Sequence, residues 1–356
     1  MGSGAPVSGP ASPGTPAQPV LVTGGGGFLG RAIVERLLAR SLPVHVFSRR
    51  SFPDLVAKGV TCVQGDLGDA EAVGKAVAGC GAVFHVAALA GAWGKREVFE
   101  RTNVTGTENV IAACQRHGVP KLLFTSSPSV ISGTEFEDHE GVDESHPYPS
   151  EYLADYPRTK ALAERAVLAA NSPQLATVAL RPHLIVGPGD PHLLPRVISQ
   201  ARAGKLRIVG EGKNTVALTN VANAAEAHLL AFDRLAPGAA CAGKAYFIAQ
   251  EEPVELWTWI NTILEGLGVP TIKKQISYRA AFRLGSTLET LWRWFRLAGE
   301  PPMTRFVATQ LATSHWFDLS AARRDLGYAP AKLPMSQVNA RLFAYYLEGA
   351  GKALLA

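Results

Sequence analysis

The sequence has few of the residues that disulfide bonds and metal sites require. Only four of its 356 residues are cysteines, and no two of them form a Cys-x-x-Cys pair. The nine histidines form no His-Glu-x-x-His motif, and we interpret the acidic stretch around His139 and His146 as a solvated loop. We therefore predict no metal site and no disulfide framework, and we expect a reducing, cytoplasmic compartment.

The sequence also lacks a long apolar run and a large excess of one sign of charge. No stretch of about 18 uncharged apolar residues occurs, so no transmembrane helix is expected. The 35 basic residues are interspersed with 30 acidic ones, without the basic stripe of a nucleic-acid-binding protein. Residues 1–18 are rich in Gly, Pro, Ser and Ala and show no signal-peptide pattern, so we expect a disordered tail there.

From Val20 onward, short β-branched runs alternate with helical patterns. The runs that end near residues 24, 50, 66, 88, 127 and 189 predict strands that are apolar throughout. Such strands, separated by helices, are typical of a parallel sheet covered on both faces. We predict an α/β fold with a Rossmann-type doubly wound parallel sheet over residues 19–188 and returns at about 216–249. Residues 189–356 should form mainly a smaller, mostly helical substrate domain.

A glycine-rich stretch follows the first predicted strand. Gly24, Gly27 and Gly30 have the spacing Gly-x-x-Gly-x-x-Gly at the junction with the first predicted helix. In a dinucleotide-binding turn, the first glycine permits the tight turn, the middle one lets the backbone approach a pyrophosphate, and the last packs the helix against the strand. The N–H groups at the start of the helix, at Phe28 and Leu29, would then face the phosphate.

No carboxylate occurs where an NAD-binding fold would place one. The position about 20 residues after the glycines holds Ser48, which is followed by Arg49 and Arg50. Guanidinium groups pair well with the 2′-phosphate of NADP(H), and Arg31 beside the last glycine is a further one. We therefore predict NADP(H) rather than NAD(H), although the same arginines would also suit a solvated turn.

Tyr156 and Lys160 are four residues apart, which puts them on one face of a predicted helix. A neighbouring ammonium favours the phenolate and would lower the tyrosine pKa from about 10, which suits proton exchange at a carbonyl or alcohol oxygen. Ser126, Ser127 and Ser129 follow the fifth predicted strand, at the edge where parallel sheets bind ligands. Spacing alone does not choose among these three serines.

Several segments together resemble the extended short-chain dehydrogenase/reductase superfamily. They are "TGGGGFLG", "FHVAA", "NVTGTENV", "TSSPSV", "YPRTK" and "LRPHLIVGPGD", and "AGAWG" and "HLLPRV" resemble its 3β-hydroxysteroid dehydrogenase branch. The resemblance implies a catalytic triad of Ser127, Tyr156 and Lys160. From the patterns and the resemblance together, the predicted cofactor-binding residues are Gly24, Gly27, Phe28, Leu29, Gly30, Ser48, Arg49, Arg50, Asp66, Leu67, Ala87, Ala88, Asn103, Tyr156, Lys160, Pro182 and Leu184.

The resemblance also implies an oxidoreductase that interconverts a 3-oxo and a 3-hydroxy group on a large apolar substrate. Reduction of a 2-alkyl-3-oxoalkanoate, a β-keto acid, is the activity we favour, and a 3β-hydroxysteroid or sterol-4-carboxylate 3-dehydrogenase is the alternative. A non-catalytic NADP(H)-sensing regulator is an alternative of another class, but such proteins tend to lose the Tyr/Lys pair. A UDP-sugar epimerase fits poorly, because such an enzyme holds NAD tightly and would need an acidic residue at the position that Ser48 occupies.

Residues 254–305 are rich in Trp, Phe and Leu, which suits an apolar substrate pocket or an ordinary domain core. Arginines among these aromatics also suit a helix at a membrane surface, so peripheral membrane contact is a further hypothesis. The resemblance implies a homodimer through helices around residues 103–116 and 156–170. The predicted substrate contacts are Trp93, His183, His192 and Arg196.

Overall fold

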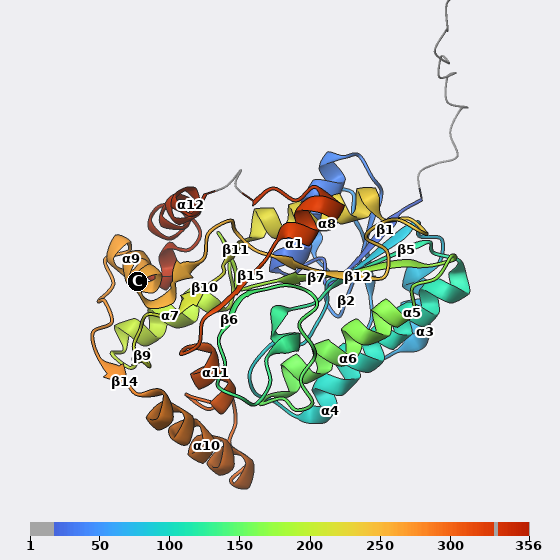
Figure 1. Cartoon of the computed structure of the whole chain (residues 1–356). Helices are drawn as coiled ribbons and strands as arrows, with labels where there is room; N and C mark the ends of the chain where they lie inside the picture. The colour runs from blue at the N-terminus through green and yellow to red at the C-terminus, as the bar shows by residue number, and fades with distance from the viewer. Residues whose placement is uncertain (1–17, 331–333, 356) are drawn as a thin grey trace, which may run out of the picture.

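The predicted strands form one parallel sheet. In a computed structural model that describes residues 18–330 and 334–355, seven strands have the order β3-β2-β1-β4-β5-β7-β12, and all neighbours run parallel (Figure 1). The predicted doubly wound α/β fold is thereby confirmed. Residues 1–17 of the predicted tail lie outside the described residues. The strands are β1 (Val20–Thr23), β2 (Val44–Ser48), β3 (Thr61–Gln64), β4 (Ala82–His85), β5 (Lys121–Thr125), β7 (Ala176–Pro182) and β12 (Lys244–Ile248).

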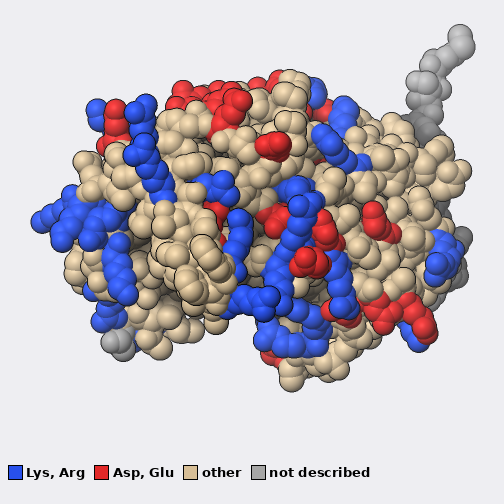
Figure 2. Space-filling model, turned by 90° about the horizontal axis from the view of Figure 1, so that it is seen from below, with Lys and Arg blue, Asp and Glu red and all other residues tan. Residues whose placement is uncertain are grey.

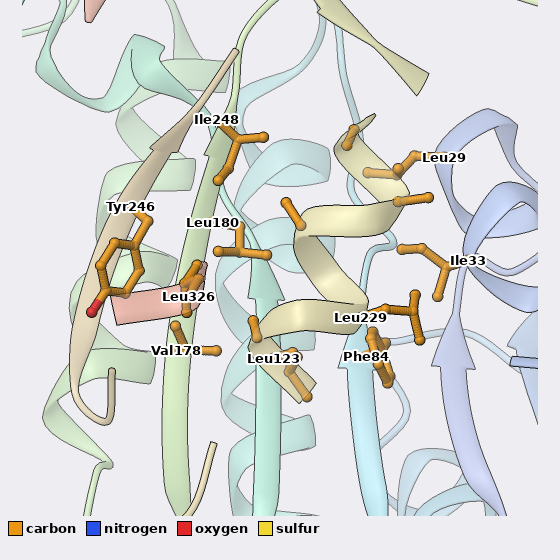
Figure 3. Packing of buried hydrophobic residues seen from close by; sticks show 14 of the residues in the cluster. Leu29, Ile33, Phe84, Leu123, Val178, Leu180, Leu229, Tyr246, Ile248 and Leu326 are labelled. Atoms are coloured by element: carbon orange, nitrogen blue, oxygen red, sulfur yellow. The ribbon is translucent and has the colours of Figure 1, made fainter. Parts of the chain in front are cut away.

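Helices cover both faces of the sheet because the strands are apolar on both sides. In β1, Val20 and Val22 belong to one core layer and Leu21 to the other, and each is at most 2% exposed. Helices α1 (Phe28–Ala39) and α8 (Val221–Arg234) pack on the first layer (Figure 3). Helices α3 (Ala70–Val77), α5 (Gly106–His117) and α6 (Asp155–Ala169) pack on the second. Shorter helical segments are α2 (Pro53–Val56), α4 (Arg96–Phe99), η1 (Glu100–Thr105) and η2 (Pro128–Ile131).

The C-terminal part of the chain builds a second hydrophobic core, which includes Trp257, Ile260 and Leu342. It is mostly helical, as predicted, and lies at the carboxyl ends of the large sheet's strands (Figure 1). Its helices are α7 (Leu193–Arg202), α9 (Leu256–Gly266), α10 (Tyr278–Trp294), α11 (Arg305–Gln310) and α12 (Met335–Leu347), with the short segments η3 (Ala322–Leu326) and η5 (Lys352–Leu354).

Three small sheets complete this part. A four-stranded sheet has the order β13-β10-β15-β6, and two pairs of strands join β11 to β8 and β14 to β9. Each strand has only two to four residues, which is too short to produce a readable alternation in the sequence. The strands are β6 (His139–Val142), β8 (Ile185–Val186), β9 (Ile208–Val209), β10 (Thr215–Val216), β11 (Thr219–Asn220), β13 (Val254–Glu255), β14 (Gln275–Ile276) and β15 (His315–Phe317).

Two local predictions were wrong. The single strand predicted over residues 176–189 is broken after Pro182, because Leu184 adopts a left-handed backbone with φ of 37°. The acidic stretch predicted as a solvated loop contains β6, and pairing with β15 leaves His139 only 7% exposed. Within residues 18–330 and 334–355, no helix is long and apolar enough to span a bilayer.

Candidate active site

The glycine turn between β1 and α1 leaves no room for side chains. Gly24 has a φ of 69°, and a Cβ there would lie 2.9 Å from the Cα of Ala87. A Cβ on Gly30 would lie 2.2 Å from the carbonyl oxygen of Gly24, so only glycine fits where the helix crosses the turn. The first and last glycines therefore occupy the positions that a dinucleotide-binding turn requires, and the end of β4 borders the turn.

The start of α1 is open to a ligand. Gly27 is exposed and is the N-cap residue, and no side chain caps the helix. The first backbone hydrogen bond of the helix is donated by Arg31 to the carbonyl of Gly27, so the amides of Phe28 and Leu29 precede the hydrogen-bonded ladder. Free amides and the positive end of the helix dipole suit a pyrophosphate. The turn therefore fits the predicted dinucleotide.

The end of β2 carries two unpaired guanidinium groups. Arg49 and Arg50 are exposed, and neither forms an ion pair with any described residue. The hydroxyl of Ser48 donates to the carbonyl of Arg50 and so fixes this turn. Arg31, which we had also considered for the 2′-phosphate, is instead paired with Asp54. The two exposed arginines remain free for an anion.

Three further predicted cofactor residues follow β3 or β4, and a fourth, Asn103 in η1, is bonded to the segment after β4. Asp66 follows β3, accepts from the amide of Gly68 at 2.8 Å and keeps 45% of its side chain exposed. Leu67 is 8% exposed and Ala88 is exposed after β4. Asn103 is buried, and its side chain both donates to and accepts from the backbone of Leu89. All of these residues border the carboxyl edge of the sheet.

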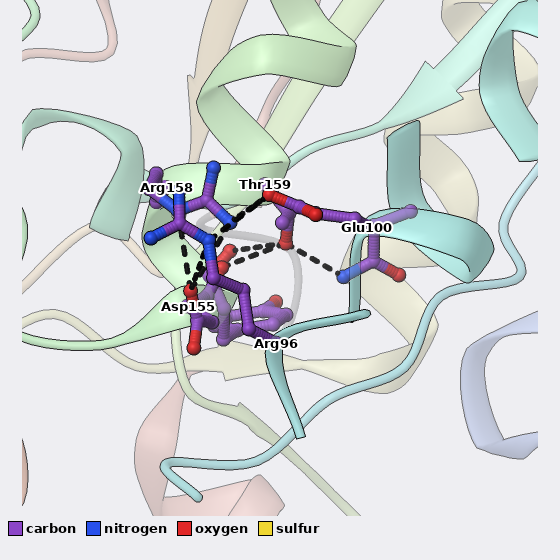
Figure 4. Close-up of polar contacts among 7 residues, drawn as sticks. Arg96, Glu100, Asp155, Arg158 and Thr159 are labelled. Atoms are coloured by element: carbon purple, nitrogen blue, oxygen red, sulfur yellow. Dashed lines mark hydrogen bonds and ion pairs between the residues drawn. The ribbon is translucent and has the colours of Figure 1, made fainter. Parts of the chain in front are cut away.

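Asn103 also links that edge to the helix of the predicted catalytic pair. Its Nδ2 donates to Thr159 Oγ1 at 3.0 Å, one residue before Lys160. Around this bond, Arg158 pairs with Glu100 at 2.8 Å and with Asp155 at 3.1 Å (Figure 4). The start of α6 is thereby fixed against η1.

Lys160 is held inside the sheet edge. It is 2% exposed, its Nζ donates to the carbonyl of Thr125 at 2.5 Å, and it lies 3.9 Å from the centre of the Phe124 ring. Burial lowers the pKa of Lys160 from 10.5 to about 7, and the charge of Glu164 partly opposes that shift. The amine therefore titrates near neutral pH.

Ser127 is the serine that contacts Tyr156. The Ser127 hydroxyl interacts with the Tyr156 side chain and acts to lower the pKa of Tyr156, against the effect of burial. Ser127 Oγ also accepts from the amide of Ser129 at 3.2 Å. The hydroxyl of Ser126, by contrast, is buried without a hydrogen-bond partner among the described residues. Geometry thus separates three serines that spacing could not.

The expected direction of the Tyr156 pKa was wrong. We expected the neighbouring ammonium to lower it, but burial raises it, and only the Ser127 hydrogen bond acts against burial. The reason is visible at Lys160, whose amine is directed to the Thr125 carbonyl and the Phe124 ring. Tyr156 is therefore held as a protonated phenol, which is the form that donates a proton.

A buried ion pair next to Lys160 escaped the sequence analysis. Arg181 Nη2 donates to Glu164 Oε1 at 2.6 Å, and both side chains are at most 2% exposed. Tyr148 also donates to Glu164, at 2.5 Å. The available signal was the spacing, since Glu164 is four residues after Lys160 and eight after Tyr156 on the same helix.

The comparison with known proteins decides the family. The family model described as the 3-beta hydroxysteroid dehydrogenase/isomerase family matches residues 21–278. The chain belongs to that family. It is 52% identical over 312 residues to a 2-alkyl-3-oxoalkanoate reductase of Stenotrophomonas maltophilia (strain K279a), covering 87% of this chain and 94% of that relative. It is 37% identical over 325 residues to a decarboxylating sterol-4-alpha-carboxylate 3-dehydrogenase of Mus musculus, covering 88% and 87%.

The fold comparison agrees with this family. The crystal structure of a Thermus thermophilus UDP-glucose 4-epimerase in complex with NAD matches with a TM-score of 0.68 at 25% identity, covering 93% of this chain and 99% of that one. The predicted membership of the extended short-chain dehydrogenase/reductase superfamily and of its 3β-hydroxysteroid dehydrogenase branch is confirmed, and so is the predicted oxidoreductase class.

Two of the predicted substrate residues contact distant segments of the chain. Trp93 lies under the guanidinium of Arg293, 5.0 Å from its ring centre, and Arg196 pairs with Glu300 at 3.0 Å. His192 is exposed at the start of α7. Two of the four residues therefore contact the end of α10 and the loop that follows it.

His183 follows Pro182 directly and is 7% exposed. Its Nε2 is 2.7 Å from Nδ1 of His315, whose Nε2 is 3.0 Å from the carbonyl of Gln310. A carbonyl can only accept, so His315 must donate from Nε2 and His183 must donate to His315. Burial and His315 hold the pKa of His183 well below its usual range, so the ring is neutral and cannot act as the cation that we considered for a carboxylate.

Proposed function

We propose that this protein is an NADP(H)-dependent oxidoreductase that interconverts the 3-oxo and 3-hydroxy groups of a large apolar substrate. The favoured reaction is reduction of a 2-alkyl-3-oxoalkanoate. The observation that carries this proposal is the placement of Tyr156 and Lys160 one turn apart on α6, with Ser127 interacting with Tyr156, at the sheet edge that the glycine turn borders. The 52% identity to a reductase of that name supports the choice of substrate.

In the proposed reaction, Tyr156 donates its phenolic proton to the carbonyl oxygen of the substrate. When bound, the nicotinamide supplies the hydride that the carbonyl carbon accepts. Ser127 holds the same oxygen through its hydroxyl, which stabilises the developing negative charge. Lys160, which titrates near neutral pH, restores the proton of Tyr156. In the reverse direction, the same groups remove the proton from the 3-hydroxyl.

A substrate panel tests the proposal. Absorbance of NADPH and of NADH should be followed with 2-alkyl-3-oxo acids of several chain lengths and, in the reverse direction, with NADP+ and NAD+ and 3β-hydroxysterols that carry a 4-carboxylate. We expect turnover with the keto acids and little with the sterols. Sterol oxidation alone would replace the favoured reaction by its alternative. Tight NADPH binding without turnover of any carbonyl would point to the non-catalytic regulator.

The preference for NADP(H) rests on Arg49 and Arg50. Two exposed guanidinium groups without a carboxylate partner suit a 2′-phosphate, and charge-assisted bonds of this kind contribute about 1.5–3 kcal/mol each when they are well formed. Replacing both residues by Ala should raise the KM for NADPH by about tenfold or more and leave the KM for NADH nearly unchanged. Arg40→Ala, which breaks an exposed pair with Asp233 at the other end of α1, is the control. An equal effect on both cofactors would contradict the preference.

We also propose a homodimer through η1, α5 and α6. Val98 and Leu162, on and beside these helices, are 48% and 40% exposed. A symmetric contact would cover both side chains, and the network around Arg158 would keep the two helices in register (Figure 4). Sedimentation velocity of the protein and of Leu162→Glu tests this, because a charge in that contact should shift the dimer towards monomer.

A further inference from the structure

Helix α10 is attached to the protein along one narrow face. Ala281, Gly285 and Glu289 are its buried residues, spaced four apart. A Cβ on Gly285 would lie 2.6 Å from the carbonyl carbon of Thr304, so α10 touches the backbone at the start of α11. Glu289 accepts from the amide and the guanidinium of Arg305. Other residues of α10, such as Phe282 and Trp292, are half-buried, whereas Arg283, Leu284 and Leu291 are exposed.

The second half of α10 and the residues that follow it expose apolar side chains. Trp294 is 79% exposed, Phe295 is 65% exposed, and their rings stack with centres 6.1 Å apart. Leu284, Leu291 and Leu297 are 45%, 37% and 45% exposed. We call these five side chains the α10 tip. Single exposed apolar residues are ordinary, but five on one short segment, two of them stacked aromatic rings, favour an interaction surface.

The charge around the α10 tip is positive and uncompensated. Residues 278–299 contain four arginines and a single acid, Glu289, which is buried. Arg279, Arg283 and Arg296 form no ion pair with any residue that the structure describes. Figure 2, which looks onto the side from which α10 projects, shows an uncharged area in its left half that is flanked by Lys and Arg. The surface that faces a partner is therefore apolar and cationic.

This combination favours an anionic lipid surface over a second copy of the chain. A second copy would present a surface of the same positive charge, so several unpaired arginines, among them Arg283 and Arg296, would be desolvated together, and like charges in such a contact repel. At a lipid surface, Trp and Phe insert between headgroups, and Arg extends its stem along them towards anionic phosphates. We propose that the α10 tip docks on an anionic membrane surface.

Docking there would bring the membrane to the substrate side of the protein. Arg293, between Leu291 and Trp294, lies over Trp93, and Glu300 just beyond the tip pairs with Arg196. Both contacts join the tip to residues that we predict to touch substrate. That the docked protein takes its apolar substrate from the lipid rests on the proposed function, whereas the docking itself does not.

Vesicle cosedimentation tests the docking without any turnover. The full-length protein should sediment with vesicles of phosphatidylcholine and phosphatidylglycerol, and much less with phosphatidylcholine alone. The double variant Trp294→Ser/Phe295→Ser should lower the partition coefficient on the order of tenfold or more. Arg283→Gln and Arg296→Gln should each lower it about fivefold, and this loss should vanish at high salt.

Leu347→Ser is the matched control, because Leu347 is 42% exposed at the end of α12, a helix that lies away from α10 (Figure 1). It should sediment like the wild type. Equal sedimentation of the control and the double variant would overturn the docking. Lipid-free self-association that only Trp294→Ser/Phe295→Ser abolishes would also overturn it, in favour of a contact between copies. Reduction of a short, water-soluble 3-oxo acid should be the same in the wild type and the double variant, so failure of the docking is distinguishable from failure of the proposed function.

Discussion

The glycine turn and the α10 tip differ in how tightly their residues are packed. At Gly30, a single added carbon would lie 2.2 Å from a backbone oxygen. At Trp294, a whole indole is 79% exposed. The turn holds the groups that must meet a cofactor in fixed positions, and neighbouring atoms enforce those positions. The α10 tip holds no reacting group, and its side chains are available for contact with another surface.

The polar groups of the two regions differ likewise: those near the glycine turn are buried and bonded, and those near the α10 tip are exposed. Asn103 and Lys160 are buried and bonded to backbone carbonyls, so the free energy of each depends on one specific partner. Arg279 and Arg283 are exposed, and their contribution depends on what approaches from solution. Substitutions near the turn should therefore change turnover or folding, and substitutions at the tip should change only association.

The largest expected effect comes from removing one atom, the phenolic oxygen of Tyr156. Tyr156→Phe removes the proposed proton donor and the hydrogen bond with Ser127, and leaves the ring in place. Because a positioned general acid contributes about 10²–10⁴-fold, kcat should fall by that range. The Kd for NADPH, measured by fluorescence titration, should change by about twofold at most, since a single hydroxyl is a small part of a dinucleotide site.

Tyr152→Phe is the control for that measurement. Tyr152 lies four residues earlier, and its hydroxyl donates to the carbonyl of Val130 at 3.0 Å, outside the proposed triad. Its loss should cost about 1 kcal/mol of stability and little turnover. If Tyr156→Phe retains full turnover, or if the two variants lose turnover equally, Tyr156 is not the proton donor. The sheet edge at the glycine turn would then not be shown to be the catalytic site.

The second prediction compares two glycines that lie in helices. Gly30→Ala in α1 places a methyl against the carbonyl of Gly24, and relief of that contact should cost about 1–3 kcal/mol and weaken NADPH binding. Gly74→Ala in α3 meets only side-chain ends at 3.7 Å or more, so it should be neutral or stabilise by up to about 1 kcal/mol. Urea unfolding of both variants checks the signs. Equal effects would mean that the turn is not tightly packed.

The sequence was sufficient for features that depend on local pattern and insufficient for those that depend on partners. Apolar runs predicted the strands of the large sheet, and the glycine spacing predicted the turn, because a turn of this kind has few acceptable residues. No local pattern showed that Lys160 would bond to Thr125, or that Ser127 rather than Ser126 would reach Tyr156. These contacts join residues about 30 positions apart, and side-chain direction decides them.

In the C-terminal part, the short strands could not be predicted from sequence for the same reason. Strands of two to four residues, such as β8 and β15, exist because a neighbouring strand supplies their hydrogen bonds. Their own composition does not demand them. The break at Leu184 is likewise a tertiary result, since leucine has no preference for a positive φ. The sequence left open whether Trp294 is exposed, because a run of Trp and Phe among arginines suits a domain core, a substrate pocket or a surface helix.

The third prediction is a slope of stability with pH, and it concerns Lys160. Burial holds its pKa at about 7 in the folded protein, against 10.5 for an ordinary lysine. Between these pH values the unfolded chain binds one more proton than the folded one, so the free energy of unfolding must rise as the pH rises. A single proton limits the slope to about 1.4 kcal/mol per pH unit. Lys160→Met removes that proton, so its gain in stability over the wild type should be largest near pH 7 and shrink towards pH 10, as measured by urea unfolding without cofactor.

Lys75→Met is the matched control for this slope. Lys75 is exposed on α3, and its ion pair with Glu71 raises its pKa, so it stays charged in both states throughout the same range. Its unfolding free energy should therefore run parallel to that of the wild type. If Lys160→Met also runs parallel, Lys160 is charged inside the folded protein near neutral pH. The amine would then not titrate near neutral pH, and the role that we propose for Lys160 in restoring the proton of Tyr156 would lose its support.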